Sequence, residues 1–457
     1  MRLVVVPPLI DPTITPVVAD DDRLVDLNEL FLRRVLAPEA LDALARRVPE
    51  ADAVFVRAAA AVLDRAGRPD EATLRALGLV LRVVSRTDPA LRLAGDDVEL
   101  VEGSTESSAH VVAAAARTRL FDQETAVAAG LDGPVHLVVE TDQQLPAAVA
   151  VVAVVGASNV VLCGRFARAH RAALGRVAAL AGVRFADWSP RWRLGAAWSP
   201  EPVRWARHAD EVVPGDRWAG WLTPADLGAV PGAAWSDCVG LTVAATRCDG
   251  DLLVGADGTA AAAPFPAPAV ELLVGVPGIG VDEVTATAAR LADEGRLAGI
   301  GPFRLPAGAP SHRLGHPVEI DRSPAHDLPR WTHVVGGPAG DGIDLAALVE
   351  RFGARVPLYP GRFGACCLRA GTRPPWEPAA VVVDSTLVNL RTGRAFGLHP
   401  RLAPLVRRLA EGERGALDPL PEARRTTLTD QLERAGVLTP ARPSPGTPLP
   451  AAPRGES

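Results

Sequence analysis

Short apolar runs alternate with helical segments between residues 135 and 186, and this alternation constrains the fold more than any other feature of the chain. It predicts strands over residues 135–140, 160–164 and 183–186, with helices over 146–155 and 171–181 between them. Strands that alternate with helices in this way pair in parallel and are covered on both faces. We therefore expect an α/β fold with a doubly wound parallel sheet.

Changes in pattern divide the 457 residues into further regions. Apolar residues recur at helical spacing between residues 20 and 86, and seven of the nine tryptophans lie between residues 186 and 240. Strands and helices alternate again from residue 241, but they are fewer than a full eight-fold barrel needs. We expect five regions in chain order: a helical and doubly wound domain at 1–190, a tryptophan-rich connector at 191–240, a partial (β/α) barrel at 241–375, a small domain of three strands and two helices at 376–440, and a disordered tail at 441–457.

The composition excludes several classes of function. The chain contains no lysine, so it cannot use a phosphate-loop lysine, a Schiff-base lysine or the strand lysine of a kinase. A net charge of −6 argues against nucleic acid as a partner, and no apolar run is long enough to cross a membrane. The scattered cysteines fit reduced thiols, so we expect a cytoplasmic protein; they are Cys163, Cys238, Cys248, Cys366 and Cys367.

The sequence Val-Val-Glu-Thr-Asp-Gln-Gln-Leu-Pro-Ala-Ala at 138–148, followed by Val-Val-Leu-Cys-Gly-Arg at 160–165, resembles the cobalamin-binding half of radical S-adenosylmethionine enzymes. The resemblance implies a ligand beyond the carboxyl ends of parallel strands, against backbone amides and a helix N-terminus. Cys163 stands at one glycine position of that family. The alternative is an unliganded doubly wound domain. The cofactor implied is cobalamin, in contact with Thr141, Gln144, Leu145, Gly164 and Arg165.

The cluster-binding loop of that family is degenerate in this chain. The family holds its iron–sulfur cluster with three cysteines at spacings of four and three, after the first barrel strand. Here only Cys248 stands in place, while Leu252 and Gly255 fill the other two positions. We therefore expect no iron–sulfur cluster and no radical S-adenosylmethionine chemistry, and we interpret the chain as a degenerate member of the family.

Residues 386–400 are similar to the small winged-helix-like domains that bind peptides in ribosomal-peptide modification pathways. The pattern predicts a meander of strands over 381–383, 387–390 and 395–398, followed by helices near 401–410 and 422–435. The resemblance implies that a peptide adds as a strand to an exposed sheet edge. An ordinary structural winged helix is the alternative. We place the peptide-binding edge at Val388, Asn389 and Leu390.

Two other groups of residues invite a chemical interpretation. Cys366 and Cys367 lie close to Arg362 and Arg369, which would favour a thiolate, but alternation along a strand puts the two cysteines on opposite faces, so one of them is explained as a core residue. His312 and His316 are four residues apart, but Gly315 and the proline that follows His316 argue against a helix that would align them. We expect no metal site.

These features lead to one main hypothesis and two alternatives. The main hypothesis is an accessory or scaffold protein in the maturation of a ribosomal-peptide natural product. Its partners would be a precursor peptide and a catalytic enzyme, such as an intact radical enzyme. The first alternative is a cobalamin-dependent enzyme without a conventional iron–sulfur cluster, and the second is a binding module that senses a small ligand.

Overall fold

The computed structural model of the protein describes most of the chain. The described residues are 1–9, 14–65, 71–93, 98–194, 201–249, 252–262, 268–276, 278–303, 305–306, 319–321, 326–328, 331–335, 345–352, 376–413 and 415–438. The predictions for Cys366 and Cys367, for His312 and His316, and for the tail at 441–457 lie outside these residues. Within them, no helix has the length and apolar character needed to span a membrane.

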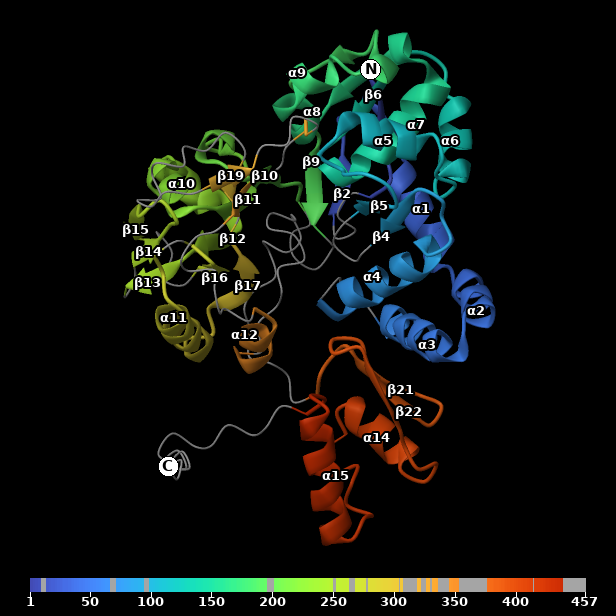
Figure 1. Ribbon diagram of the computed structural model, residues 1–457, viewed down its shortest axis with the longest axis vertical. Helices are drawn as coiled ribbons and strands as arrows, with labels where there is room; N and C mark the ends of the chain where they lie inside the picture. Colours follow the sequence, from blue (N-terminus) through green and yellow to red (C-terminus); the bar gives the residue numbers. More distant parts are fainter. Residues whose placement is uncertain are drawn as a thin grey trace.

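A five-stranded parallel sheet forms the centre of the first unit, at the top of Figure 1. Its strands lie in the order β3 (Arg23–Asp26), β1 (Leu3–Val6), β6 (Val135–Val138), β7 (Val160–Cys163) and β8 (Arg184–Phe185). In chain order this is 2-1-3-4-5, one of the two common orders of doubly wound sheets. The α/β class and the three strands predicted between residues 135 and 186 are confirmed.

The two faces of this first sheet are covered by different structures. Helices α5 (Ser108–Ala115), α6 (Asp122–Ala129) and α7 (Leu145–Val155) cover the face that includes Leu137 and Leu162. On the other face, Val138 packs against Trp192 and Trp205. These two tryptophans come from β9 (Arg191–Leu194) and β10 (Arg204–Ala206), and both are buried. In the described residues, tryptophans therefore take the place of a second helical layer.

Four helices follow β3 and extend the first unit toward the C-terminal unit. They are α1 (Leu27–Leu36), α2 (Pro38–Arg47), α3 (Glu50–Arg65) and α4 (Glu71–Ser85). The helical prediction for residues 20–86 is thus confirmed from Leu27 onward, whereas Arg23–Asp26 pair with β1 as a strand. Asp26 ends that strand and begins α1, because its carboxylate accepts the backbone N–H of Glu29 at 2.9 Å.

A second parallel sheet of five strands follows in the chain, at the left of Figure 1. Its strands lie in chain order: β10, β11 (Trp218–Leu222), β12 (Cys238–Ala245), β16 (Ala269–Val274) and β17 (Leu297–Pro302). The segment at 191–240, interpreted as a connector, supplies the first two of these strands. The second sheet therefore begins earlier in the chain than residue 241.

The links between these strands are of two kinds. Helices α10 (Pro224–Ala229) and α11 (Val281–Asp293) make two of them. Between β12 and β16 the chain instead forms an antiparallel sheet of β13 (Arg247–Asp249), β14 (Leu252–Val254) and β15 (Ala260–Ala262). The loop compared with a cluster loop is this antiparallel sheet, and it follows the third strand of the second sheet. The expectation that it follows the first strand is wrong, because β10 and β11 precede it.

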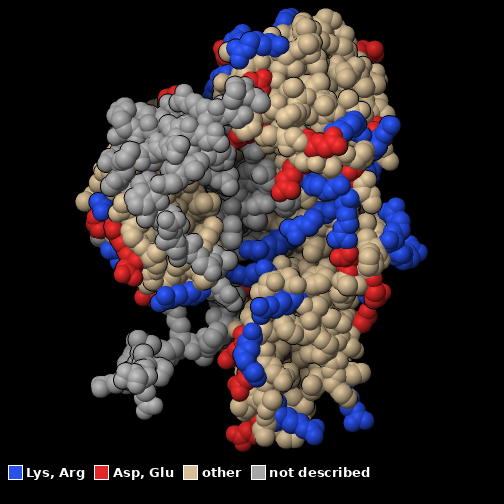
Figure 2. Space-filling model, viewed as in Figure 1, with Lys and Arg blue, Asp and Glu red and all other residues tan. Residues whose placement is uncertain are grey.

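The C-terminal unit is a three-stranded antiparallel sheet with two helices. Its elements are β21 (Ala380–Val383), β22 (Thr386–Asn389), β23 (Arg394–Gly397), α14 (Ala403–Ala410) and α15 (Glu422–Arg434). The predicted meander and helices are confirmed. One face of the sheet packs on α14 and α15, and the other packs on α2, α3 and α4 through residues such as Val381 and Val388. In Figure 1 this unit lies below α3, and Figure 2 shows arginine side chains gathered just above it, over α4.

The remaining described elements are short and lie around the two parallel sheets. They are β2 (Ile14–Val17), which pairs with β9, β4 (Leu91–Leu93), β5 (Val98–Leu100), α8 (Arg165–Ala169), α9 (Arg171–Leu174), β18 (Leu305–Pro306), β19 (Glu319–Asp321), β20 (Trp331–Val335) and α12 (Leu345–Phe352). The helix predicted over 171–181 is therefore much shorter than expected, since α9 ends at Leu174 and Gly175 follows it.

Candidate functional site

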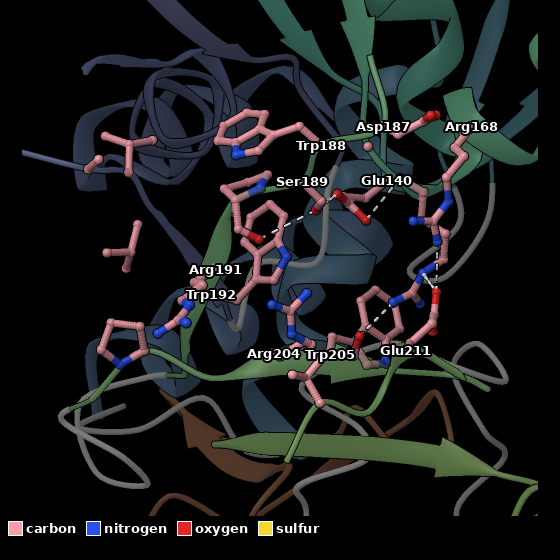
Figure 3. Close-up of a pocket in the computed structure, with 18 of the residues that line it drawn as sticks. Glu140, Arg168, Asp187, Trp188, Ser189, Arg191, Trp192, Arg204, Trp205 and Glu211 are labelled. Atoms are coloured by element: carbon pink, nitrogen blue, oxygen red, sulfur yellow. Dashed lines mark hydrogen bonds and ion pairs between the residues drawn. The ribbon is translucent and has the colours of Figure 1, made fainter. Parts of the chain in front are cut away.

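A cavity of about 750 Å³ lies at the carboxyl end of β6 and β7, where the first sheet meets β9 and β10. Glu140, Gly164 and Arg165 line it from the first sheet. Trp192 lines it from β9, and Trp205 lines it from β10, the first strand of the second sheet (Figure 3). We call it the sheet-edge cavity. Its position matches the rule that ligands of open α/β sheets bind beyond the carboxyl ends of the strands.

Glu140 is a buried carboxyl group in the wall of the sheet-edge cavity, with only 5 % of its surface exposed. The Ser189 hydroxyl donates a hydrogen bond to Oε1, and the backbone N–H of Arg165 donates one to Oε2 at 3.3 Å. Burial raises the pKa of Glu140, while the positive charge of Arg165 opposes that rise. The carboxyl group therefore keeps its proton to a higher pH than an exposed glutamate does. Glu140 is not among the residues predicted from the sequence to bind a ligand, although a charged residue at the end of an apolar run indicates this kind of position.

Arg165 connects the first sheet to the strands of the second. Its Nη2 donates a hydrogen bond to the carbonyl oxygen of Trp205 at 2.7 Å, and its guanidinium lies 4.4 Å from the centre of that indole ring. Its Nε lies 3.1 Å from a carboxylate oxygen of Glu211. Among the described residues its Nη1 is buried and has no hydrogen-bond partner. The predicted cofactor contact is thus a lining residue that already holds the cavity wall together.

Gly164 is required by the approach of the protein's own backbone. Its φ is +95°, and a Cβ placed on it would lie 2.6 Å from the carbonyl oxygen of Val139. The backbone N–H of Gly164 donates to the carbonyl oxygen of Trp188 at 2.8 Å, which holds the chain in this position. The residue lines the cavity, but the space left by its missing side chain is taken by Val139.

The other three predicted cofactor residues do not line the sheet-edge cavity. Gln144 is fully buried: its Oε1 accepts the backbone N–H groups of Glu140 and Thr141 at 2.8 and 3.2 Å. Its Nε2 donates to the carbonyl oxygen of Pro7 at 3.1 Å. Leu145 is buried in the core under the sheet, and Thr141 is half-buried. The five residues therefore do not form one surface that a corrinoid would cover.

The described cysteines are poor candidates for chemistry. Cys163 lies in β7 and Cys248 in β13, and both are fully buried. Burial raises the pKa of each thiol, and it raises the pKa of Cys238 to about 12. Among the described residues, no group of three His, Cys, Asp or Glu side chains lies close enough to hold a metal ion.

The predicted peptide-binding residues lie on the central strand of the C-terminal sheet. Val388 and Asn389 belong to β22, which pairs with β21 on one side and β23 on the other, and both are 0 % exposed. Leu390 is also buried, and Val388 packs toward α3. Asn389 fixes the next turn, because its Oδ1 accepts the N–H of Arg391 at 3.0 Å. The prediction of an edge strand at these residues is wrong, since a local pattern of alternation does not state which strand is central.

The free edge of this sheet is β23, and we call Arg394–Gly397 the β23 edge. Among the described strands, β23 pairs only with β22. The N–H of Leu398 bonds to the carbonyl oxygen of Ser385 at 2.7 Å. Because alternate residues of a strand direct their N–H and C=O groups to the same side, those of Ala395 and Gly397 point away from β22. Both residues are exposed.

Comparison with known proteins assigns no function to the sheet-edge cavity or to the β23 edge. No family model matches the chain, and neither a curated protein nor a solved structure matches it.

Proposed function

We propose that this chain is an accessory protein that captures a precursor peptide in ribosomal-peptide maturation and presents it to a catalytic partner. The observation that carries the proposal is the β23 edge, where the N–H and C=O groups of Ala395 and Gly397 have no strand partner among the described residues. An extended peptide that adds there gains a ladder of backbone hydrogen bonds. Small side chains at both positions leave room for it.

The domain identities form part of the same proposal. The strand order of the first sheet supports a domain like the cobalamin-binding domains, and the sequential parallel strands of the second sheet support a partial (β/α) barrel. Three antiparallel strands followed by two helices support a winged-helix-like C-terminal domain. Peptide addition is favoured at β23 over β21, because β21 packs against α3 through Val381.

The proposal is tested by removing one outward-facing N–H from the β23 edge. Ala395→Pro deletes that donor but leaves the hydrogen bonds to β22 intact, since Ala395 faces Val388 in a pair that exchanges none. Ala395→Val is the matched control, because it keeps the N–H. A panel of fluorescein-labelled precursor leader peptides is titrated by fluorescence anisotropy. We expect the proline variant to weaken binding about tenfold or more and the valine variant to bind like the unchanged protein.

Two results would contradict peptide capture at this edge. One is equal affinity of the proline variant and the unchanged protein for a leader peptide that binds. The other is the absence of binding by every leader peptide in the panel. Circular dichroism of both variants checks that the C-terminal sheet remains folded.

A small-ligand-sensing module is the second candidate function. It is favoured by the sheet-edge cavity, in which Glu140 is buried among arginines and tryptophans. The cobalamin-dependent enzyme is favoured less, because Gln144 and Leu145 do not line this cavity. An absorption spectrum after anaerobic reconstitution with cobalamin decides that alternative: corrinoid bands that persist through gel filtration would support it, and a colourless protein would remove it.

A further inference from the structure

One side of the sheet-edge cavity carries two arginines that share a single carboxylate. Arg165 and Arg168 both belong to α8, which starts directly after β7. A carboxylate oxygen of Glu211 lies 3.1 Å from Arg165 Nε and 3.1 Å from Arg168 Nη2. All three residues line the cavity. Two guanidinium groups against one carboxylate leave this side with an excess of positive charge.

A second pair of arginines repeats the arrangement on another side of the cavity. Arg191 in β9 and Arg204 in β10 both line it, and Figure 3 shows them across the cavity from Arg168 and Glu211. Both place an Nη2 atom 2.7 Å from the carboxylate of Asp216. This side therefore also has two guanidinium groups for one carboxylate.

The other charged residues that line the cavity do not remove this excess. Glu140 is buried, and its two carboxyl oxygens already accept hydrogen bonds from the Ser189 hydroxyl and the backbone N–H of Arg165. Asp187 lies 3.7 Å from an arginine of α9, and Arg2 is neutralised by Asp22 at 2.9 Å. Asp210 is exposed to solvent and compensates at most one of the two excess guanidinium charges.

We propose that the sheet-edge cavity binds a small molecule with two oxyanion groups, carboxylates or phosphates, one at each arginine pair. Paired guanidinium groups recognise such oxyanions by charge-assisted hydrogen bonds in a fixed fork. Trp192 and Trp205 also line the cavity, and their apolar rings favour an apolar spacer in the ligand. A volume of about 750 Å³ lies within the range of small-molecule sites. The site is separate from the β23 edge and does not depend on peptide capture.

Calorimetric titration of the full chain tests the proposal. The probes are the linear dicarboxylates from succinate to suberate, α,ω-bisphosphates with matching spacers, and monocarboxylates of the same lengths. We expect at least one diacid or bisphosphate to bind saturably and about tenfold or more tighter than the corresponding monoacid. Whether the dicarboxylates or the bisphosphates bind more tightly identifies the kind of oxyanion. Equal binding of diacids and monoacids, or no saturable binding by either double-acid series at millimolar concentration, overturns the proposal.

Variants of each arginine pair locate the binding. Arg168→Gln and Arg191→Gln remove one half-exposed guanidinium from each side, and each is expected to weaken the best double acid about tenfold. Arg117→Gln is the matched control, because Arg117 pairs with Glu102 at 2.7 Å and does not line the cavity. Unchanged affinity in both cavity variants, or an equal loss in the control, contradicts the assignment. Ala395→Pro is expected to leave double-acid binding unchanged, so this proposal and peptide capture fail independently.

Discussion

The two parallel sheets of this chain bury a glutamate each, and they bury it in different places. Glu140 lies two residues after the end of β6 and lines the sheet-edge cavity. Glu271 lies within β16, and its Oε2 accepts the indole N–H of Trp221 from β11 at 2.7 Å. An acid at the end of a strand stays within reach of a ligand, whereas an acid inside the sheet ties one strand to another. The first sheet therefore carries a candidate site at its edge, and the second uses its buried acid for cohesion.

The largest loss of stability is expected at Gly164, where the backbone of Val139 lies against the end of the first sheet. Gly164→Ala would force a Cβ against the backbone of Val139, so we expect the free energy of unfolding to fall by about 3–4 kcal/mol. Gly182→Ala is the matched control: its φ is +96°, but the nearest atom to the new Cβ is 3.9 Å away. That variant loses about 1–2 kcal/mol from backbone strain alone. Urea unfolding measures both, and equal losses would show that the close approach to Val139 is unimportant.

In the second sheet, loss of the hydrogen bond between Trp221 and Glu271 is expected to lower the free energy of unfolding less than Gly164→Ala does. Trp221→Phe removes the donor and leaves a buried carboxyl group with one partner fewer, which costs about 2 kcal/mol. Trp221→Phe, Glu271→Leu and the two changes combined form a double-mutant cycle, because leucine has no acceptor for the indole N–H; the two changes should not be additive. Additive losses in urea unfolding would mean that this acid does not tie the strands together.

Glu140 should make stability depend on pH. Because burial raises the pKa of Glu140 in the folded chain, folding favours its protonated form, and that contribution is lost as the pH rises through the raised pKa. Glu140→Gln removes the effect, so we expect the stability of the variant relative to the unchanged protein to be higher at pH 8 than at pH 5. Glu102→Gln, the same change at an exposed position, is the control. If the difference in thermal unfolding temperature between this variant and the unchanged protein did not depend on pH, Glu140 would be in contact with water and not buried in the cavity wall.

The smallest loss of stability is expected at the contact between Asp327 and the start of α5 in the first unit. Asp327 lies between β19 and β20, and its carboxylate accepts the backbone N–H of Ser108 at 2.7 Å and also the Ser108 hydroxyl. It thereby caps α5 of the first unit. Asp327→Asn should cost about 0.5–1 kcal/mol. Burial alone would raise the pKa of Asp327, but the hydrogen bonds from Ser108 outweigh burial and hold this pKa below its usual range. The stability that Asp327 contributes is therefore present at neutral pH and is lost as the pH falls through the lowered pKa. Hydrogen exchange should accelerate in α5 and not in α6; acceleration of both would point to a general loosening.

Strands and helices could be predicted from the sequence wherever a short run or a regular spacing of apolar residues marks them. The strands over 135–138 and 160–163 and the three strands of the C-terminal sheet follow from short apolar runs, and the helices follow from apolar spacing. Strand β11 could not be found in this way, because its sequence Trp-Ala-Gly-Trp-Leu lacks an alternating pattern and lies among Pro, Gly and Arg. Its parallel partners on both sides, rather than its own sequence, determine that it is a strand.

The candidate site was less predictable for a related reason. Gln144 and Gly164 have the residue types of a binding loop, yet the contacts that occupy them come from Pro7 and Val139, which a local motif does not include. Val388 has the pattern of a strand, but its central place depends on pairing with both neighbours. The predicted contacts with a cofactor or peptide therefore failed at Gln144 and Val388, because the partner of each side chain depended on distant parts of the chain.

The packing of the C-terminal sheet on α3 also sets the order in which this protein can finish folding. On the ribosome, α3 emerges long before β21, which supplies Val381 to the same core. At about 5–20 residues per second, the roughly 300 residues between them take on the order of 15–60 s to synthesise. Throughout that interval the part of α3 that packs on β21 is uncovered on the nascent chain, although α2 and α4 can already pack on the rest of the helix. It is the surface at which we expect a chaperone to act, and a message truncated before residue 380 would yield a product that aggregates.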